Sequence, residues 1–275
     1  MNLVVIPLFL TLGFIIGLPA SMVGLGGGFI IVPTLILFGL PAKKAVAVSL
    51  VAMCGTTFSA AFGYIRQRRV DYKLSLLYDV LDVPGVVSGA YITTILPKDV
   101  LVGICGFFII FISLLLVRNR GVTSSTARSK ETNVTGKGWR RKMSDSSNQI
   151  FEYAIRWPSL ALISSFTGGL VTGLAGLGGG ITDTTTMILL GVPPHIAVAS
   201  SEFAMALTNG TGVIAHGILH NILLEYAFPL TVGTIIGAQI GCSLTKRIKG
   251  KALRRILCAI AFLLGLRLIL MLFNI

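Results

Sequence analysis

The sequence lacks most of the side chains with which enzymes and metalloproteins work. Only 12% of its 275 residues are charged, just 10 are acidic, and there are 3 histidines and 4 cysteines. The cysteines show no C-x-x-C or other metal-ligand spacing, and no nucleophile with a matching base is evident. These absences argue against an enzyme, so we predict no catalytic residue, no metal site and no cofactor.

Long apolar runs dominate the chain instead. Hydrophobic residues make up 54% of it, which lies outside the range of soluble domains. Eight runs could each cross a bilayer core of about 30 Å as a helix, and they lie at 3–22, 44–65, 74–95, 99–117, 158–175, 195–216, 223–245 and 256–273. Two shorter runs, 29–40 and 181–192, should be half-helices or short tilted spans. We therefore predict an all-α polytopic membrane protein.

The chain also repeats itself. Residues 14–53 and 166–205 share 19 identities in 40 aligned positions, and both copies contain the stretch GLGGG. Counting the short run, each copy holds five apolar segments. The sequence thus predicts two structural repeats of about five helical segments each, residues 1–117 and 158–275, with a short or broken helix after each glycine stretch.

Lysine and arginine cluster at particular segment ends, which predicts the topology. The clusters lie at 66–73, 118–156 and 246–255. Because basic ends stay in the cytoplasm, they should share one side, and the two repeats should then be inverted relative to each other. The net charge of +13 follows from this topology, and no basic groove with interleaved aromatics suggests a nucleic-acid partner.

The segment between the repeats, residues 118–157, is polar, basic and rich in serine, threonine and glycine. Such a composition is typical of a flexible connector, and its charge places it in the cytoplasm. A short amphipathic surface helix at 150–157 is an option within it. We predict a flexible basic cytoplasmic linker.

Three consecutive glycines in each copy form the core of the predicted site. Without a Cβ they allow positive φ and a close approach of backbone to a ligand, and they interrupt a helix at membrane depth. The free amides at the start of the following short helix suit an anion. Tight helix packing alone is the alternative. The predicted substrate-binding glycines are Gly26, Gly27, Gly28, Gly178, Gly179 and Gly180.

Neutral polar side chains on the next segment of each copy are further candidates. They could hold an oxyanion without a fixed charge that would trap it, although hydroxyls in membrane helices also bond the carbonyl four residues back. We assign Ser49, Thr57, Ser201 and Asn209 to substrate binding.

Carboxyl groups within the apolar segments indicate that transport could be coupled to protons. Glu202 stands where the first copy has Leu50, and because an intramembrane carboxyl is costly and usually functional, it is the candidate proton carrier. A hydrated position near the interface is the alternative. Asp79 and Asp82 share one helix face and either titrate as a pair or, as the sequence favours, pair with the basic stretch 66–69.

The glycine-rich segments resemble a known family. GLGGGFIIVPTLILFGLPAKKAVAVSL, which recurs as GLAGLGGGITDTTTMILLGVPPHIAVASS, resembles the TauE/SafE sulfite exporter family of membrane proteins. The resemblance implies transport of small sulfur-containing anions, sulfite or organosulfonates, across the cytoplasmic membrane. The second copy departs from the pattern, since Thr185 replaces the counterpart of Pro33 and Asp183 follows the glycines, where it could repel an anion.

These features predict a secondary transporter that moves a small anion by alternating access of two repeats around the paired glycine breaks. The expected partners are the anion and the lipid bilayer in a multi-pass cell-membrane protein, with proton coupling and a homodimer left open. An anion channel using the same site is the alternative, and an intramembrane enzyme using Glu202 and the histidines is a more distant one. Valine at Gly27 or Gly179 should abolish transport.

Overall fold

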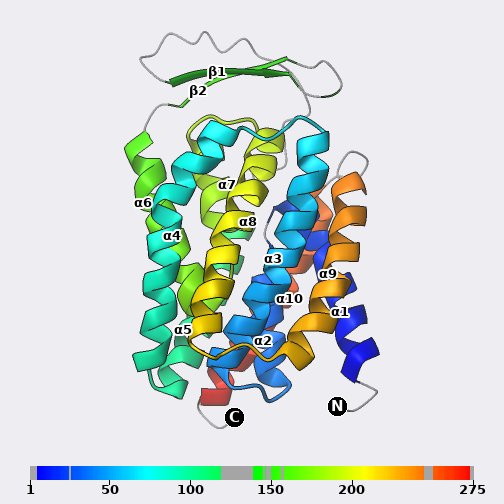
Figure 1. Ribbon diagram of the computed structural model, residues 1–275, viewed down its shortest axis with the longest axis vertical. Helices are drawn as coiled ribbons and strands as arrows, with labels where there is room; N and C mark the ends of the chain where they lie inside the picture. The colour runs from blue at the N-terminus through cyan, green and yellow to red at the C-terminus, as the bar shows by residue number, and fades with distance from the viewer. Residues whose placement is uncertain are drawn as a thin grey trace.

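The computed structural model describes residues 5–24, 26–118, 139–144, 146, 150–155, 158–244 and 250–272. These residues form a helical bundle with a two-stranded hairpin across one end (Figure 1). The helices are α1 (Val5–Val23), α2 (Gly28–Leu37), α3 (Ala42–Arg66), α4 (Tyr72–Ile95), α5 (Lys98–Arg118), α6 (Pro158–Ala175), α7 (Gly180–Leu189), α8 (Pro194–Ile218), α9 (Leu224–Leu244) and α10 (Gly250–Leu272). Each coincides closely with a predicted segment, so the helical fold prediction is confirmed.

Glycine and proline determine where the short helices begin and end. Gly24 follows the end of α1 with a φ of +77°, and Gly27 precedes α2 with a φ of +91°. Glycine adopts this left-handed conformation without a steric penalty, so the chain turns back there. Pro41 and Pro193 then occupy the N-cap positions of α3 and α8, where a missing amide proton costs little. Both short helices, α2 and α7, have 10 residues.

Helices of each half of the chain pack against helices of the other half. The first helix of each half lies along the fourth helix of the other, α1 against α9 and α6 against α4, and α3 contacts α8 between them. Glycines bring the backbones together at these contacts. A Cβ added at Gly17 would lie 2.6 Å from the carbonyl oxygen of Thr234, and one at Gly85 would lie 2.6 Å from that of Phe166. Small residues at helix contacts are the usual means of packing within membranes.

The outer surface of the bundle is apolar, and its interior contains many polar groups. Val80, Ile214 and Phe228 are 65%, 65% and 73% exposed, whereas Asp82 and Glu202 are fully buried. An extensive exposed apolar surface marks contact with another apolar phase, which a lipid bilayer provides. By length and hydropathy alone, α3 and α9 meet the criteria for a membrane span. The structure therefore agrees with a helical membrane protein.

The hairpin replaces a helix that the sequence allowed. Strand β1 (Trp139–Ser144) pairs antiparallel with β2 (Ile150–Ile155), so the surface helix considered for 150–157 is wrong for the strand residues. Burial alternates along β2, with Tyr153 and Ile155 buried and Glu152 exposed, a period typical of strands. The two buried side chains pack against α4, α7 and the start of α8. The remaining linker residues, 119–138, 145, 147–149 and 156–157, lie outside the described residues.

Candidate functional site

The two glycine breaks contact each other between α3 and α8. A Cβ at Gly28 would collide with the carbonyl oxygen of Gly176, and a Cβ at Gly180 would lie 2.7 Å from the carbonyl oxygen of Gly24. Real Cβ atoms do not approach backbone oxygens so closely, so both positions require glycine. The prediction placed these glycines at one site, and the structure brings the two stretches together.

A matched pair of methionines encloses the crossing of the two breaks. A Cβ at Gly26 would lie 3.6 Å from the sulfur of Met53 and 3.6 Å from that of Met205. Both methionines are fully buried and occupy equivalent positions in the two copies. Methionine is flexible and fills irregular space, so these side chains are suited to occupy a site when no ligand is present.

Two of the four predicted polar side chains bond directly to the glycine breaks. The Ser49 hydroxyl donates to the carbonyl oxygen of Gly176 at 3.1 Å, and the Ser201 hydroxyl donates to that of Gly180 at 3.4 Å. Both serines are fully buried. In this conformation the serines hold the glycine backbone in place, and a ligand there would compete for their hydroxyl protons.

The other two predicted side chains behave differently. The Thr57 hydroxyl donates to the carbonyl oxygen of Met53 at 2.8 Å, the bond within its own helix that the sequence offered as the alternative. Its methyl group faces the break, 3.8 Å from a Cβ at Gly26. Asn209 is fully buried, and neither its amide oxygen nor its amide nitrogen has a hydrogen-bond partner. Such an unsatisfied amide is costly and is free to bind a ligand.

Glu202 lies deep in the protein, beside the first glycine break. It is fully buried, so the alternative of a hydrated interfacial position is wrong. The Gly26 amide points toward its carboxyl group, but neither carboxyl oxygen closes a hydrogen bond of normal geometry. A carboxylate near the amides that begin α2 is favoured by the partial positive charge of a helix N-terminus. Glu202 therefore lies beside the Gly26 amide, at the break that precedes α2.

A second carboxyl lies at the other break. Asp183 is in the first turn of α7, where its amide donates to the carbonyl oxygen of Gly179 at 2.9 Å. A Cβ at Gly179 would lie 3.3 Å from its Oδ2 atom. Each short helix thus begins beside a carboxyl group of the protein itself. The sequence showed Asp183 only as a group that could repel an anion, and its contact with Asp82 of α4 could not be derived from spacing along the chain.

His216 is buried, and both of its ring nitrogens contact other groups of the protein. His216 Nε2 lies 3.0 Å from the carbonyl oxygen of Gly173, and its Nδ1 lies 3.3 Å from the side-chain nitrogen of Asn221. Both ring nitrogens are thus engaged within the fold. His216 therefore ties α8 to α6 and is not available for the enzyme reaction considered as a distant alternative.

A family model described as "Sulfite exporter TauE/SafE" matches residues 9–268. The chain belongs to this family. The protein is therefore a membrane transporter and not an enzyme. The resemblance carried by the glycine-rich segments is confirmed.

Two relatives that match this TauE/SafE protein over nearly their whole length are described as probable membrane transporters. The probable membrane transporter protein YunE of Bacillus subtilis (strain 168) is 30% identical over 271 residues, 95% of this chain and 96% of the relative. The probable membrane transporter protein MJ0441 of Methanocaldococcus jannaschii is 24% identical over 280 residues, 96% and 95% of the two chains. Sulfite exporter TauE/SafE family protein 3 of Arabidopsis thaliana is 34% identical over 80 residues, 29% of this chain and 17% of the relative. No solved structure matches the chain.

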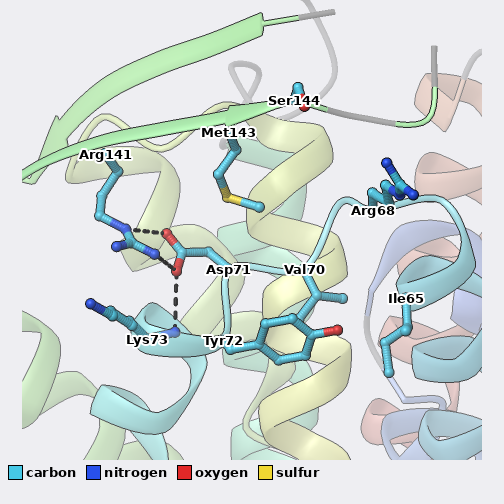
Figure 2. Close-up of a pocket in the computed structure, with 9 residues that line it drawn as sticks. All are labelled: Ile65, Arg68, Val70, Asp71, Tyr72, Lys73, Arg141, Met143 and Ser144. Carbon is cyan, nitrogen blue, oxygen red and sulfur yellow. Dashed lines mark hydrogen bonds and ion pairs between the residues drawn. The ribbon is translucent and has the colours of Figure 1, made fainter. Parts of the chain in front are cut away.

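The hairpin end of this TauE/SafE transporter carries a surface pocket of about 440 Å³ (Figure 2). It is lined by Ile65, Arg68, Val70, Asp71, Tyr72, Lys73, Arg141, Met143 and Ser144. Its basic side chains come from the α3–α4 turn (Arg68), the start of α4 (Lys73) and β1 (Arg141), so the hairpin and this turn share one end of the bundle.

Asp71 ties the hairpin to α4. Its carboxylate accepts hydrogen bonds from the amides of Lys73 at 3.2 Å and Leu74 at 3.3 Å, capping the helix. Arg141 donates to both carboxylate oxygens, with Nε 2.8 Å from Oδ2, and the Tyr153 hydroxyl donates to Oδ2 at 2.6 Å. Burial raises the pKa of Asp71, but the hydrogen bonds from Arg141 and Tyr153 outweigh it and hold this pKa below its usual value.

Replacing Arg141 with alanine should release the hairpin from α4. We expect faster hydrogen exchange of the β1 and β2 amides and a loss of about 1.5–3 kcal/mol in unfolding free energy, the range for hydrogen bonds to a charged group. Lowering the pH should weaken the same contact between the hairpin and α4. Because the pKa of Asp71 is lowered in the folded state, its contribution is complete above the ordinary carboxyl pKa and is lost as the pH falls through the lowered value.

The control is Glu152→Gln, which breaks an exposed 2.8 Å ion pair with Lys142 on the same hairpin. Exposed pairs contribute little, so exchange of the strands should not change. Equal exchange rates in the Arg141→Ala and Glu152→Gln variants would contradict the assigned role of Asp71.

Proposed function

We propose that this protein is a secondary transporter that moves a small sulfur-containing anion across the cell membrane by alternating access of two inverted repeats. The observation that carries the proposal is the meeting of the two glycine breaks, each at the start of a short helix. Paired broken helices that meet inside the membrane are the usual site of substrate binding in such carriers.

An inverted arrangement is supported by the packing of the halves. α1 lies on α9 as α6 lies on α4, so equivalent helices make equivalent contacts. In Figure 1, α6 begins at the hairpin end of the bundle, whereas α1 begins at the opposite end. The basic turn 66–73 contacts the hairpin through Asp71 and Arg141. This contact supports placing both on the cytoplasmic side, as the positive-inside rule requires.

The chemistry of the breaks favours an anion. The amides at the start of α2 and α7 carry partial positive charge, and Ser49, Ser201 and Asn209 supply neutral donors near them or on the adjoining helix. Glu202 already takes the place of such an anion beside Gly26. These groups select for charge and small size. The choice of sulfite or an organosulfonate rests on the name of the family.

In a carrier the protein must change conformation to expose the site, whereas a channel provides a continuous open path. Here Gly28 and Gly180 are in backbone contact with the opposite break, and Met53 and Met205 enclose the crossing. A substrate can reach the amides only when the two breaks separate. A site that opens by movement of one half against the other is typical of alternating access, so we favour a carrier.

Flux measurements in proteoliposomes test the proposal. Uptake and efflux of radiolabelled sulfite would be measured with and without an imposed pH gradient, with an organosulfonate and a carboxylate as competitors and protein-free liposomes as the control. We expect saturable sulfite flux that the sulfonate inhibits. Flux that rises linearly with concentration would favour the channel. If none of the anions is transported by the wild-type protein, the proposed substrate class is withdrawn.

A further inference from the structure

Three carboxyl groups from two helices meet where α4 packs against the second half of the chain. Asp79 and Asp82 come from α4 and Asp183 from α7, and they are 6%, 0% and 0% exposed. The Thr208 hydroxyl of α8 donates to Asp79 Oδ1 at 2.9 Å and lies 3.3 Å from Asp82 Oδ2. The structure thus pairs both α4 aspartates with Thr208, and not with the basic stretch 66–69 that the sequence favoured.

Asp82 and Asp183 converge on one point of α6. A Cβ at Gly168 would lie 3.6 Å from Asp82 Oδ1 and 3.4 Å from Asp183 Oδ1, and the two carboxyl groups are within hydrogen-bonding reach of each other. A hydrogen bond between two carboxyl groups needs a proton on one of them, because an ionised carboxylate only accepts. A proton on either group would therefore let Asp82 and Asp183 form a hydrogen bond with each other.

Much of the polar surface in this cluster has no partner. Asp79 Oδ2, Asp82 Oδ1 and both oxygens of Asp183 lack hydrogen bonds. The fully buried Tyr78 hydroxyl also lacks one and lies within electrostatic reach of Asp82 and Asp183. Buried polar groups are normally satisfied, and several carboxylates cannot all remain charged at such a distance. The unsatisfied oxygens are positions for added protons.

The groups around the cluster are neutral or acidic. From α6, Ser165 faces it, from α7 Thr182 does, and from α8 Thr208 does, while α4 adds the Tyr78 hydroxyl. Of the other ionisable groups described on α8, Glu202 faces Gly26, His216 contacts Gly173, and His195 is exposed in the first turn. Among the described residues, no three carboxyl, imidazole or thiol groups are arranged to hold a metal ion, so the geometry favours protons over a metal cation.

Asp183 links this cluster to the glycine break. It lies in the first turn of α7, and its Oδ2 would be 3.3 Å from a Cβ at Gly179. An ionised carboxylate there uses the favourable field of the helix N-terminus and repels an incoming anion. A protonated Asp183 gains nothing from this field and does not repel the anion. The charge on Asp183 therefore decides whether the amides of α7 are available to a substrate.

We propose that Asp82 and Asp183, supported by Asp79, form a proton-carrying site whose protonation makes the second glycine break competent to bind the substrate anion. The inference rests on the proposed binding of an anion at the breaks. A proton from water adds to a carboxylate oxygen of the cluster and leaves from the same oxygen on the other side of the membrane. Because coupling between two ligands is reciprocal, anion binding tightens proton binding, and the two travel together.

The experiment uses Asp82→Asn and Asp183→Asn, with Asp99→Asn as the matched control. Asp99 is an exposed carboxyl in the first turn of α5. Infrared spectra of the purified proteins in lipid report protonated carboxyl groups without any substrate. We expect a protonated-carboxyl band at neutral pH in the wild type that is smaller in both cluster variants and unchanged in the control. Sulfite uptake driven by a pH gradient should fall to its level without a gradient in both cluster variants, whereas sulfite exchange at equal pH should persist.

The outcomes separate this inference from the proposed function. An unchanged band in both cluster variants, or wild-type pH-driven uptake in both, would overturn the proton site, as would uptake driven by a sodium gradient and not by a pH gradient. If the wild type moves no anion, transport of this substrate class fails while the infrared result still decides the proton site. If the variants do not fold, a pH titration of the wild-type band decides: complete ionisation at neutral pH overturns the inference, and a persistent band supports it.

Discussion

Alanine at Gly28 or Gly180 is expected to reduce transport by about a hundredfold or more, the cost of displacing a binding site by about 1 Å. The added Cβ at Gly28 would collide with the Gly176 carbonyl oxygen and the sulfur of Met53, and the one at Gly180 would lie 2.7 Å from the Gly24 carbonyl oxygen. Because the obstacles include backbone atoms, the breaks must move apart. Flux per amount of membrane-inserted protein is the measurement.

The matched control for these variants is Gly210→Ala. Gly210 lies within α8, and a Cβ there would meet no heavy atom within 4 Å. Alanine should therefore leave transport unchanged and stabilise the helix by about 0.5–1 kcal/mol. Gly27, which the sequence suggested for valine, is a less clear test because its φ of +91° adds backbone strain. Wild-type flux in both Gly28→Ala and Gly180→Ala would refute a site built on contact between the breaks.

Replacement of Glu202 with glutamine is expected to reduce the stimulation of transport by a pH gradient without abolishing it, because the Asp82–Asp183 site remains. Glutamine keeps the size of the side chain but removes its charge beside the Gly26 amide. An ionised Glu202 competes with the substrate anion at the start of α2, so its loss should also tighten sulfite binding at neutral pH. A charge at a partly buried helix terminus is worth up to about 2 kcal/mol, which corresponds to tightening by up to about thirtyfold.

Sulfite binding and pH-driven flux would be measured together for this variant. Glu225→Gln is the control, because Glu225 is an exposed carboxyl in the first turn of α9 and the same substitution there should change neither quantity. Weaker sulfite binding in Glu202→Gln than in the wild type would show that the carboxyl serves the substrate in another way, and the competition argument would be abandoned.

Prediction from sequence succeeded where local rules act. Helices need about 20 apolar residues to cross a bilayer, so the apolar runs located α3, α8 and their neighbours closely. Glycine triplets break helices wherever they occur, so the short α2 and α7 were expected. The same local rules failed at 150–155, where the residues form a strand. Only Glu152 is polar in this short segment, and so short an apolar run does not by itself distinguish a helix from a strand.

The sequence by itself determined that this protein is a helical membrane protein of two related halves with a glycine break in each. Only the tertiary structure decided what lies at those breaks. Glu202 belongs to the second copy yet faces Gly26 of the first, and Asp183 meets Asp82 across α4 and α7. These contacts arise from packing between segments more than 100 residues apart. Hydropathy along the chain determines which segments are helices, whereas the close approach of small residues determines which helices, and which buried charges, become neighbours.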